Sequence, residues 1–162
     1  MPETADSSRN IATVERLIVA PASAIFDLLA NPARHQEIDG SGTVKGVPDG
    51  GDGGAQRLAL GSKFGMSMKM GIGYTMENTV VEFEENVRIA WQPRPTQTVM
   101  AWFVGGRIWR YQLVEQDGGT LVRESWEISQ EKQPWAVRNL RSKTVDSMTK
   151  TLERIAKVVE TK

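Results

Sequence analysis

The chain has 162 residues, which is enough for one domain around a single core. Its 20 Lys and Arg residues balance its 20 Asp and Glu residues, so the formal net charge is zero. That balance argues against a function built on nucleic-acid phosphates, which would need a basic face. There is no cysteine and only one histidine, which excludes disulfides, thiolate catalysis and metal sites built from cysteines or several imidazoles.

The first ten residues, MPETADSSRN, are small and polar, and we expect a disordered leader over 1–10 and a single domain over 11–162. The leader has no apolar stretch of the kind that a signal peptide carries. No run in the chain approaches the ~18 apolar residues that a membrane span needs. We therefore expect a cytoplasmic protein with no membrane span.

A strand and two short helices are predicted next. The β-branched stretch TVERLIV, 13–19, predicts a strand that ends before Pro21. Ser23 can cap a helix over SAIFDLLAN. The residue before a proline avoids helical angles, so this helix should end near Asn31, and Pro32 suits the first turn of a second helix through ARHQEI.

His35 lies in this second, polar helix, so we expect it to be a solvated surface residue. Glu37 and Asp39 are close to it in sequence, but one histidine and two carboxylates make a weak metal signal. The following segment predicts a short strand over 42–46 and a glycine-rich loop, PDGGDGG, over Pro48-Gly54. Its glycines lack the lysine and Ser/Thr of a phosphate-binding loop. We therefore expect no metal and no cofactor.

From Leu58 the apolar residues alternate with period two, which predicts strands near 59–70, 72–84, 87–94, 105–115 and 119–129. Turn-forming residues separate them, most clearly Asp117-Gly118-Gly119. Strands joined by such short connections should be antiparallel neighbours.

The strand over 72–84 changes its alternation along its length. Its beginning favours Tyr74 and Met76 on the inner face, whereas its end favours Val81 and Phe83. A β-bulge near Asn78 would reconcile the two halves.

After Pro134 the apolar period becomes helical and predicts one long amphipathic helix of roughly seven turns. Its expected buried stripe consists of Trp135, Val137, Leu140, Val145, Met148, Leu152, Ile155 and Val159. One face of the sheet is the only comparable apolar surface that can cover this stripe. The sequence therefore predicts an α+β fold with helices on one face of an antiparallel sheet.

The inner face predicted from the alternation is rich in methionine and aromatic residues: Phe64, Met66, Met68, Met70, Trp91, Trp109, Tyr111 and Trp126. Methionine is unbranched and polarizable, and it suits surfaces that must fit varied shapes. Because ligand pockets are mostly apolar, the pattern favours a cavity between sheet and helix. The alternative is an ordinary core in which methionine fills gaps.

Two charged residues interrupt this apolar face. Glu124 lies between Val122 and Trp126, and Arg107 precedes Trp109 by two residues. A buried carboxylate must be paired, protonated or wet, so we expect Glu124 to contact either Arg107 or the Tyr111 hydroxyl. Such a polar group could orient a ligand's carbonyl or hydroxyl, or act as an acid or base with a raised pKa. The alternative puts both charges at the rim of the sheet, in water.

Two stretches resemble a known family. The stretch APASAIFDLLANPARHQEIDGSGTV, 20–44, resembles the opening of the polyketide cyclase/dehydrase branch of the START-like, Bet v 1-like superfamily (SRPBCC). The stretch VVEFEENVRIAWQP, 80–93, resembles the paired strands of that family, joined by a tight acidic turn. The segment from Trp135 resembles its closing helix, so the likeness covers about Thr13 to Val159.

The resemblance implies the helix-grip fold: a curved seven-stranded antiparallel sheet around a long C-terminal helix, with two short helices between strands one and two. It also implies a hydrophobic cavity, and a function in binding a small hydrophobic or aromatic ligand, polyketide-like or lipid-like. Two alternatives are a cyclase or dehydratase that moves protons with Glu124 or Tyr111, and a protein-interaction module with a collapsed core. No catalytic motif spans the family, so the resemblance implies no catalytic residue.

Overall fold

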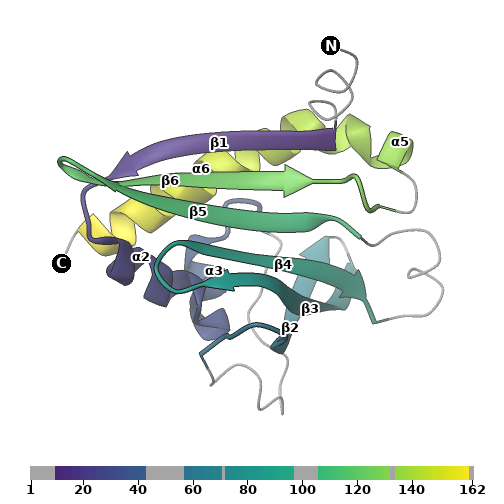
Figure 1. Cartoon of the computed structure of the whole chain (residues 1–162). Helices are drawn as coiled ribbons and strands as arrows, with labels where there is room; N and C mark the ends of the chain where they lie inside the picture. The colour runs from purple at the N-terminus through teal and green to yellow at the C-terminus, as the bar shows by residue number, and fades with distance from the viewer. Residues whose placement is uncertain (1–9, 43–56, 71, 97–105, 132–133, 161–162) are drawn as a thin grey trace.

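The computed structural model describes residues 10–42, 57–70, 72–96, 106–131 and 134–160. These residues form one six-stranded antiparallel sheet in the order β1-β6-β5-β4-β3-β2 (Figure 1). Its strands are β1 (Ile11–Ile18), β2 (Lys63–Met70), β3 (Ile72–Glu84), β4 (Arg88–Pro95), β5 (Ile108–Gln116) and β6 (Gly119–Glu127). The predicted strands are confirmed to within a few residues. The expected short strand at 42–46, which would be the seventh, lies outside the described residues except for Gly42.

Two short helical segments separate β1 from β2, as predicted. They are α2 (Ala22–Leu29) and a single-turn pair made of η1 (Pro32–Arg34) and α3 (His35–Ile38). The N-cap of α2 is Pro21, so the expected cap at Ser23 is wrong. Proline suits the position because the first backbone N–H groups of a helix have no intrahelical partner. The Asn31 side chain accepts a hydrogen bond from the Ala33 N–H, 3.2 Å, and so starts η1.

The C-terminal helix is shorter than the sequence predicts. The segment divides into α5 (Pro134–Val137), η3 (Arg138–Leu140) and the long helix α6 (Arg141–Glu160). Trp135 is 69% exposed and Leu140 is also exposed, so their predicted place in the buried stripe is wrong. The stripe itself holds from Met148 onward, where the residues buried on α6 are Met148, Thr151, Leu152, Ile155 and Ala156.

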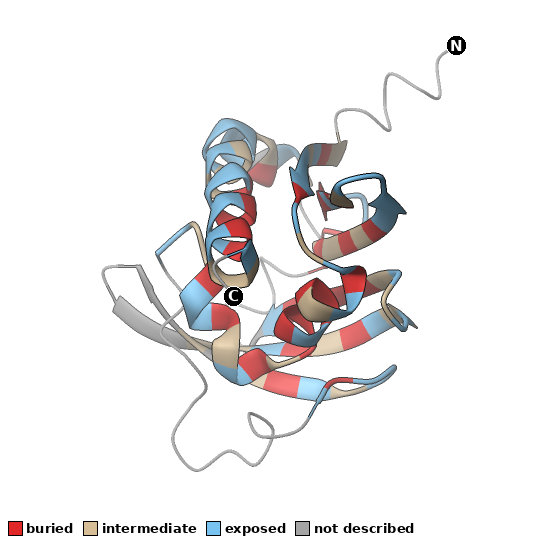
Figure 2. Ribbon diagram, turned by 90° about the vertical axis from the view of Figure 1, so that its left-hand side faces the viewer, coloured by how far each residue is buried: buried red, intermediate tan, exposed pale blue. Residues whose placement is uncertain are grey.

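The two faces of the sheet differ in chemistry because side chains alternate along each strand. On the outer face, the Arg110 guanidinium donates to Glu82, with Nε 3.0 Å from Oε2, and lies 3.8 Å from Glu127. Arg123 pairs with Glu15 on the same face, 2.7 Å. The inner face is apolar, and buried residues lie where the helices and the sheet face each other (Figure 2).

The bulge expected in β3 is present, but further along the strand than predicted. The register with β4 shifts between Val80 and Glu82. Val80 is buried and Val81 is exposed, so Val81 is not on the inner face as predicted. After the shift Phe83 turns inward, and its ring lies 5.4 Å from that of Phe26 of α2, edge to face. Val87, just before β4, is exposed.

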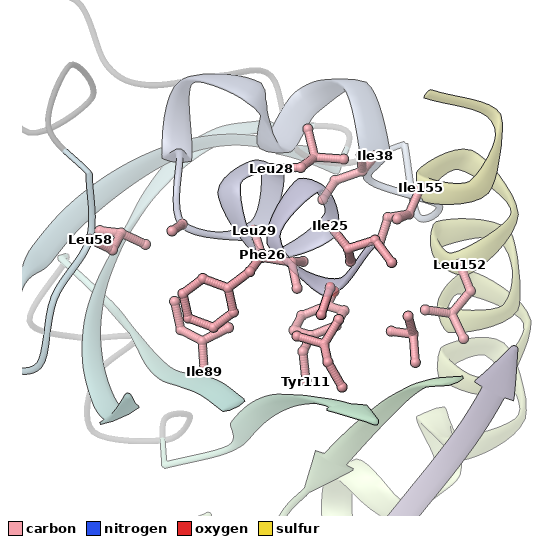
Figure 3. Close-up of a cluster of buried hydrophobic side chains, with 14 of the residues drawn as sticks. Ile25, Phe26, Leu28, Leu29, Ile38, Leu58, Ile89, Tyr111, Leu152 and Ile155 are labelled. Carbon is pink, nitrogen blue, oxygen red and sulfur yellow. The ribbon is translucent and has the colours of Figure 1, made fainter. Parts of the chain in front are cut away.

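The inner face packs against the helices as two adjoining apolar clusters. The larger one joins α2, α3 and part of α6 to the middle of the sheet. Figure 3 shows its centre, where Ile89 and Tyr111 of the sheet point toward Phe26 and Leu29 of α2, with Leu152 and Ile155 of α6 beside them. The smaller cluster consists of Ala12, Trp126, Ile128, Val137 and Met148. Val14 and Trp109 contact both clusters.

Candidate ligand-binding site

Three tryptophans lie side by side across the inner face. In the strand register Trp91 of β4 is opposite Trp109 of β5, and Trp109 is opposite Trp126 of β6. The Trp109 and Trp126 rings lie 6.5 Å apart, centroid to centroid. Trp91 and Trp126 are buried, whereas Trp109 between them remains partly exposed. A partly exposed indole between two buried ones is the kind of surface on which an aromatic ligand stacks.

The next row of the sheet holds the buried acid that the alternation predicts. Glu124 is opposite Tyr111 and is only 2% exposed. The Tyr111 hydroxyl donates to Glu124 Oε1 over 2.9 Å. Burial raises the pKa of Glu124 to about 8, opposed by the Tyr111 hydrogen bond and reinforced by the negative charge of Asp39. The same burial, with the nearby Glu124, raises the pKa of Tyr111 well above its ordinary value.

Two polar atoms on this strand face have no hydrogen-bond partner among the described residues. They are Glu124 Oε2 and the indole nitrogen Nε1 of Trp126. Buried polar groups in proteins are nearly always paired with protein, water or ligand. Val122 belongs to the larger apolar cluster and Trp126 to the smaller one, so Glu124 lies at the boundary between them. The two polar atoms that lack a hydrogen-bond partner therefore lie at the boundary between the two apolar clusters.

His35 is buried, so its prediction as a solvated surface residue is wrong. It is 4% exposed, and its Nε2 lies 2.8 Å from the Leu29 carbonyl oxygen. Its ring stacks on Trp91, with centroids 4.9 Å apart, and meets the edge of Phe64. Burial lowers the pKa of His35 to about 4, against the Leu29 hydrogen bond and Asp39, which raise it. A neutral imidazole therefore covers one face of the Trp91 indole.

Two hydrogen bonds join the residues after α3 to α6. The Gly40 N–H donates to Thr151 Oγ1 over 2.9 Å, and the Arg154 guanidinium donates to the Asp39 carbonyl over 2.7 Å. A Cβ at Gly40 would overlap the Ser147 carbonyl oxygen and lie 2.6 Å from the Thr151 backbone nitrogen. This α3–α6 contact fixes Asp39 near Glu124, Tyr111 and His35, whose pKa values it influences.

Arg107 is not the partner of Glu124. Its guanidinium Nε lies 3.4 Å from Glu131 Oε2, and Glu131 is buried after the end of β6. The register explains the difference, because Tyr111 is opposite Glu124 and Arg107 precedes it by four residues. Of the two contacts expected for Glu124, the structure contains the one with Tyr111.

The remaining predicted site residues have different outcomes. Phe64 is buried beside His35 and Trp91. Met66, Met68 and Met70 are in β2, but their side chains lie outside the described residues. Residues that sequence reasoning did not place at the site are His35, Asp39, Gly40 and Thr151. The only signal for them is the apolar Ile38, three positions after His35, which puts both on one helical face.

Two small hollows of the described residues are lined by other side chains than Glu124. One, of about 200 Å³, is on the outer face and is lined by Val87, Arg88, Gln112, Leu113, Val114, Leu121 and Arg123. The other, of about 50 Å³, lies beside Val14 and Thr149. In the described part of the chain no group of acidic or histidine side chains is arranged to hold a metal, and no helix is long and apolar enough to cross a membrane.

Several solved structures share this fold. Protein Ms6760 of Mycobacterium smegmatis superposes with a TM-score of 0.72 and 16% identity, over 96% of this chain and 94% of that one. An AHSA1-like protein of Aeromonas hydrophila has a TM-score of 0.62 and 17% identity, over 93% and 92%. The di-domain ARO/CYC protein StfQ of the steffimycin biosynthetic pathway has a TM-score of 0.64 and 10% identity, over 98% of this chain and 53% of that one.

Two curated proteins of Mycobacterium tuberculosis are similar in sequence, and both are named only as uncharacterized proteins. Rv0088 of strain H37Rv is 38% identical over 78 residues, which are 46% of this chain and 32% of that protein. MT0096 of strain CDC 1551 is 40% identical over 73 residues, 43% of this chain and 30% of that protein. The chain thus spans about a third of the length of the curated relatives it matches.

No protein-family model matches the chain. Its structural neighbours nevertheless include an AHSA1-like protein and the di-domain ARO/CYC protein StfQ, and both superpositions cover more than nine-tenths of this chain. The resemblance seen in 20–44 and 80–93 is therefore confirmed at the level of the fold. A six-stranded antiparallel sheet with a long C-terminal helix, together with these neighbours, shows that the chain has the START-like, Bet v 1-like (SRPBCC) fold.

Proposed function

We propose that the chain binds a small hydrophobic or aromatic molecule, polyketide-like or lipid-like, between the inner face of the sheet and α6. The observation that carries the proposal is the row of Trp91, Trp109 and Trp126 beside the unpaired Oε2 of Glu124. Aromatic rings supply apolar contact area, and a single buried polar atom supplies orientation. We expect the predicted methionines Met66, Met68 and Met70 to extend the same wall, and Arg107 to lie at its end.

A neutral hydrophobic dye, N-phenyl-1-naphthylamine, tests this proposal. We expect the native protein to bind the dye with a rise in dye fluorescence, and to gain thermal stability from it. Replacing the partly exposed Trp109 by leucine should weaken dye binding by about tenfold, because it removes a stacking surface worth about 1 kcal/mol or more.

Trp135→Leu is the matched control, because Trp135 is exposed on α5 and outside the tryptophan row. That variant should bind the dye like the native protein. Near-UV circular dichroism establishes that each variant keeps its packed core. If the native protein takes up no dye, or if Trp109→Leu and Trp135→Leu bind it equally, the proposal is wrong and the interaction-module alternative gains support.

A second candidate function is a proton-transfer enzyme of the cyclase or dehydratase kind. It is favoured by Glu124, whose pKa of about 8 lies close to neutral pH and whose Oε1 accepts from Tyr111. Among the structural neighbours, StfQ is a di-domain ARO/CYC protein of a biosynthetic pathway. Only this enzyme hypothesis predicts that Glu124→Gln abolishes turnover of a molecule that the variant still binds.

A further inference from the structure

The carboxyl group of Glu124 has one satisfied and one unsatisfied oxygen. Oε1 accepts the hydrogen bond from the Tyr111 hydroxyl, 2.9 Å, whereas Oε2 is buried with no partner among the described residues. An ionised carboxylate accepts hydrogen bonds through both oxygens, and leaving one bare in a buried place costs several kcal/mol. A protonated carboxyl group instead accepts at Oε1 and carries its own proton at Oε2.

Burial and the negative charge of Asp39 favour the protonated form of Glu124, and they outweigh the Tyr111 hydrogen bond, which favours the ionised form. Glu124 lies opposite Tyr111 of β5, which is neutral. Asp39, which follows α3, is negative and raises the pKa of Glu124. His35 of α3 is held neutral by burial. On β1 the residue opposite Glu124 is Val14, and Arg16 further along that strand is exposed.

The α6 side adds no charge either. The residues that α6 buries are Met148, Thr151, Leu152, Ile155 and Ala156, all uncharged. The groups that act on the pKa of Glu124 are burial, Tyr111 and Asp39, and none of these is a cation. At neutral pH roughly nine-tenths of the molecules therefore carry the acid proton, given the pKa of about 8.

The indole N–H of Trp126 is a second donor on the same face of β6. Glu124 and Trp126 are two residues apart, so their side chains leave the strand on the same side about 7 Å apart. Trp126 Nε1 is buried and has no acceptor among the described residues. Among the described residues, the strand face thus offers two hydrogen-bond donors, one on each residue.

We propose that the ligand of this site is a neutral molecule with an acceptor oxygen, a ketone or quinone carbonyl, which receives hydrogen bonds from the Glu124 carboxylic acid and the Trp126 indole. This inference rests on the proposed function, because it assigns the polar end of the same ligand. A carbonyl oxygen has two lone pairs and can accept from both donors. A carboxylate ligand is disfavoured, since the charged residue that acts on Glu124, Asp39, is itself negative and would repel a second anion.

Three naphthalene probes of nearly equal size test the inference by displacement of N-phenyl-1-naphthylamine. 2-Acetylnaphthalene carries a neutral carbonyl, 2-ethylnaphthalene lacks an acceptor, and 2-naphthoate is an anion. At about pH 6.5 we expect the ketone to bind about tenfold more tightly than the other two, since one buried hydrogen bond is worth about 1 kcal/mol. At about pH 9.5 the ketone should lose about tenfold in affinity, because ionised Glu124 no longer donates.

Two variants separate the donors. In Glu124→Gln the amide donates at every pH, so the ratio of ketone affinities at the two pH values should fall to about one. Trp126→Phe should weaken the ketone more than 2-ethylnaphthalene, because it removes a donor and keeps an aromatic ring. Trp135→Phe is the matched control for the same substitution at an exposed site.

The outcomes are distinguishable. Equal affinity for 2-acetylnaphthalene and 2-ethylnaphthalene, a preference for 2-naphthoate, or an unchanged pH ratio in Glu124→Gln overturns the carbonyl inference and leaves the proposed function standing. If the protein binds neither the dye nor any of the three probes, the proposed function itself fails.

Discussion

At the scale of single residues, the inner face holds two buried titratable side chains whose protonation is shifted in opposite senses. Burial lowers the pKa of His35 from 6.5 to about 4 and raises that of Glu124 from 4.5 to about 8. Both are therefore neutral in the folded protein near pH 6, although each is charged or partly charged there in the unfolded chain. The folded protein therefore buries neither residue in its charged form.

These two residues predict a pH dependence of the free energy of unfolding. Between about pH 4 and 6.5 the unfolded chain binds more protons at His35, so this group makes stability rise with pH. Between 4.5 and about 8 the folded protein keeps the Glu124 proton that the unfolded chain has lost, so this group makes stability fall. The two effects offset each other below 6.5, and above it only the fall remains.

From about pH 6.5 to 8 we therefore expect stability to decrease by about 2 kcal/mol, at about 1.4 kcal/mol per pH unit. Urea unfolding followed by tryptophan fluorescence over this range measures it. Glu124→Gln should remove the decrease and keep the rise due to His35 at lower pH. A decrease that persists in the variant would assign it to another group.

The sequence predicted part of this pair. The apolar alternation around Glu124 predicted a contact with either Arg107 or Tyr111, and left open that Glu124 lies at the rim. The strand register of the hairpin brings it opposite Tyr111. His35 was predicted wrongly, because its burial depends on stacking against Trp91, a contact between distant parts of the chain. Local polarity carries no information about such a contact. Arg107 was misplaced because a shared strand face does not fix a position along the strand.

At the scale of elements, the C-terminal segment forms a shorter helix than the periodic pattern predicts. The apolar positions from Val145 to Val159 recur every three or four residues, as one helical face requires. Before Val145 the steps are two, three and five, and the chain there forms α5 and η3 instead of continuing α6. The exposed Trp135 follows from this break, which the irregular spacing could have indicated.

The α3–α6 contact is an element-scale feature that a single atom can disrupt. We expect Gly40→Ala to destabilise the protein by about 2 kcal/mol or more, because the new methyl group would overlap the Ser147 carbonyl of α6. Thermal unfolding measures the effect. Gly61→Ala is the control: Gly61 has a φ of +82° and open space around it, so this variant should cost only about 1 kcal/mol of backbone strain. Equal costs at the two sites would contradict a close contact at Gly40.

At the scale of the whole molecule, the two edge strands of the sheet have different neighbours. α6 packs along β1 at one edge, whereas β2 at the opposite edge pairs with β3 alone among the described strands. The neighbour relations of β2 to β6 were predicted, and the pairs β2–β3, β3–β4 and β5–β6 follow from short connections. The pairing of β1 with β6 does not follow from any local pattern, because it joins residues such as Thr13 and Ser125, 112 positions apart.

This arrangement predicts a gradient of amide hydrogen exchange. We expect the slowest exchange in β5 and β6, which have strand neighbours on both sides, and the fastest strand exchange in β2, where every second amide faces no strand. Exchange followed by mass spectrometry on native protein measures the gradient. Protection in β2 equal to that in β6 would mean that another segment covers the β2 edge.

The pairing of β1 with β6, the last strand of the sheet in the sequence, also has a consequence for biosynthesis. A ribosome makes β1 before β2 to β5, yet the strand that pairs with β1 through backbone hydrogen bonds is β6, which follows all of them. Until β6 and α6 have been made, Ala12 and Ile18 lack the neighbours that bury them, so the nascent polypeptide is open to chaperones and to misassociation during that interval.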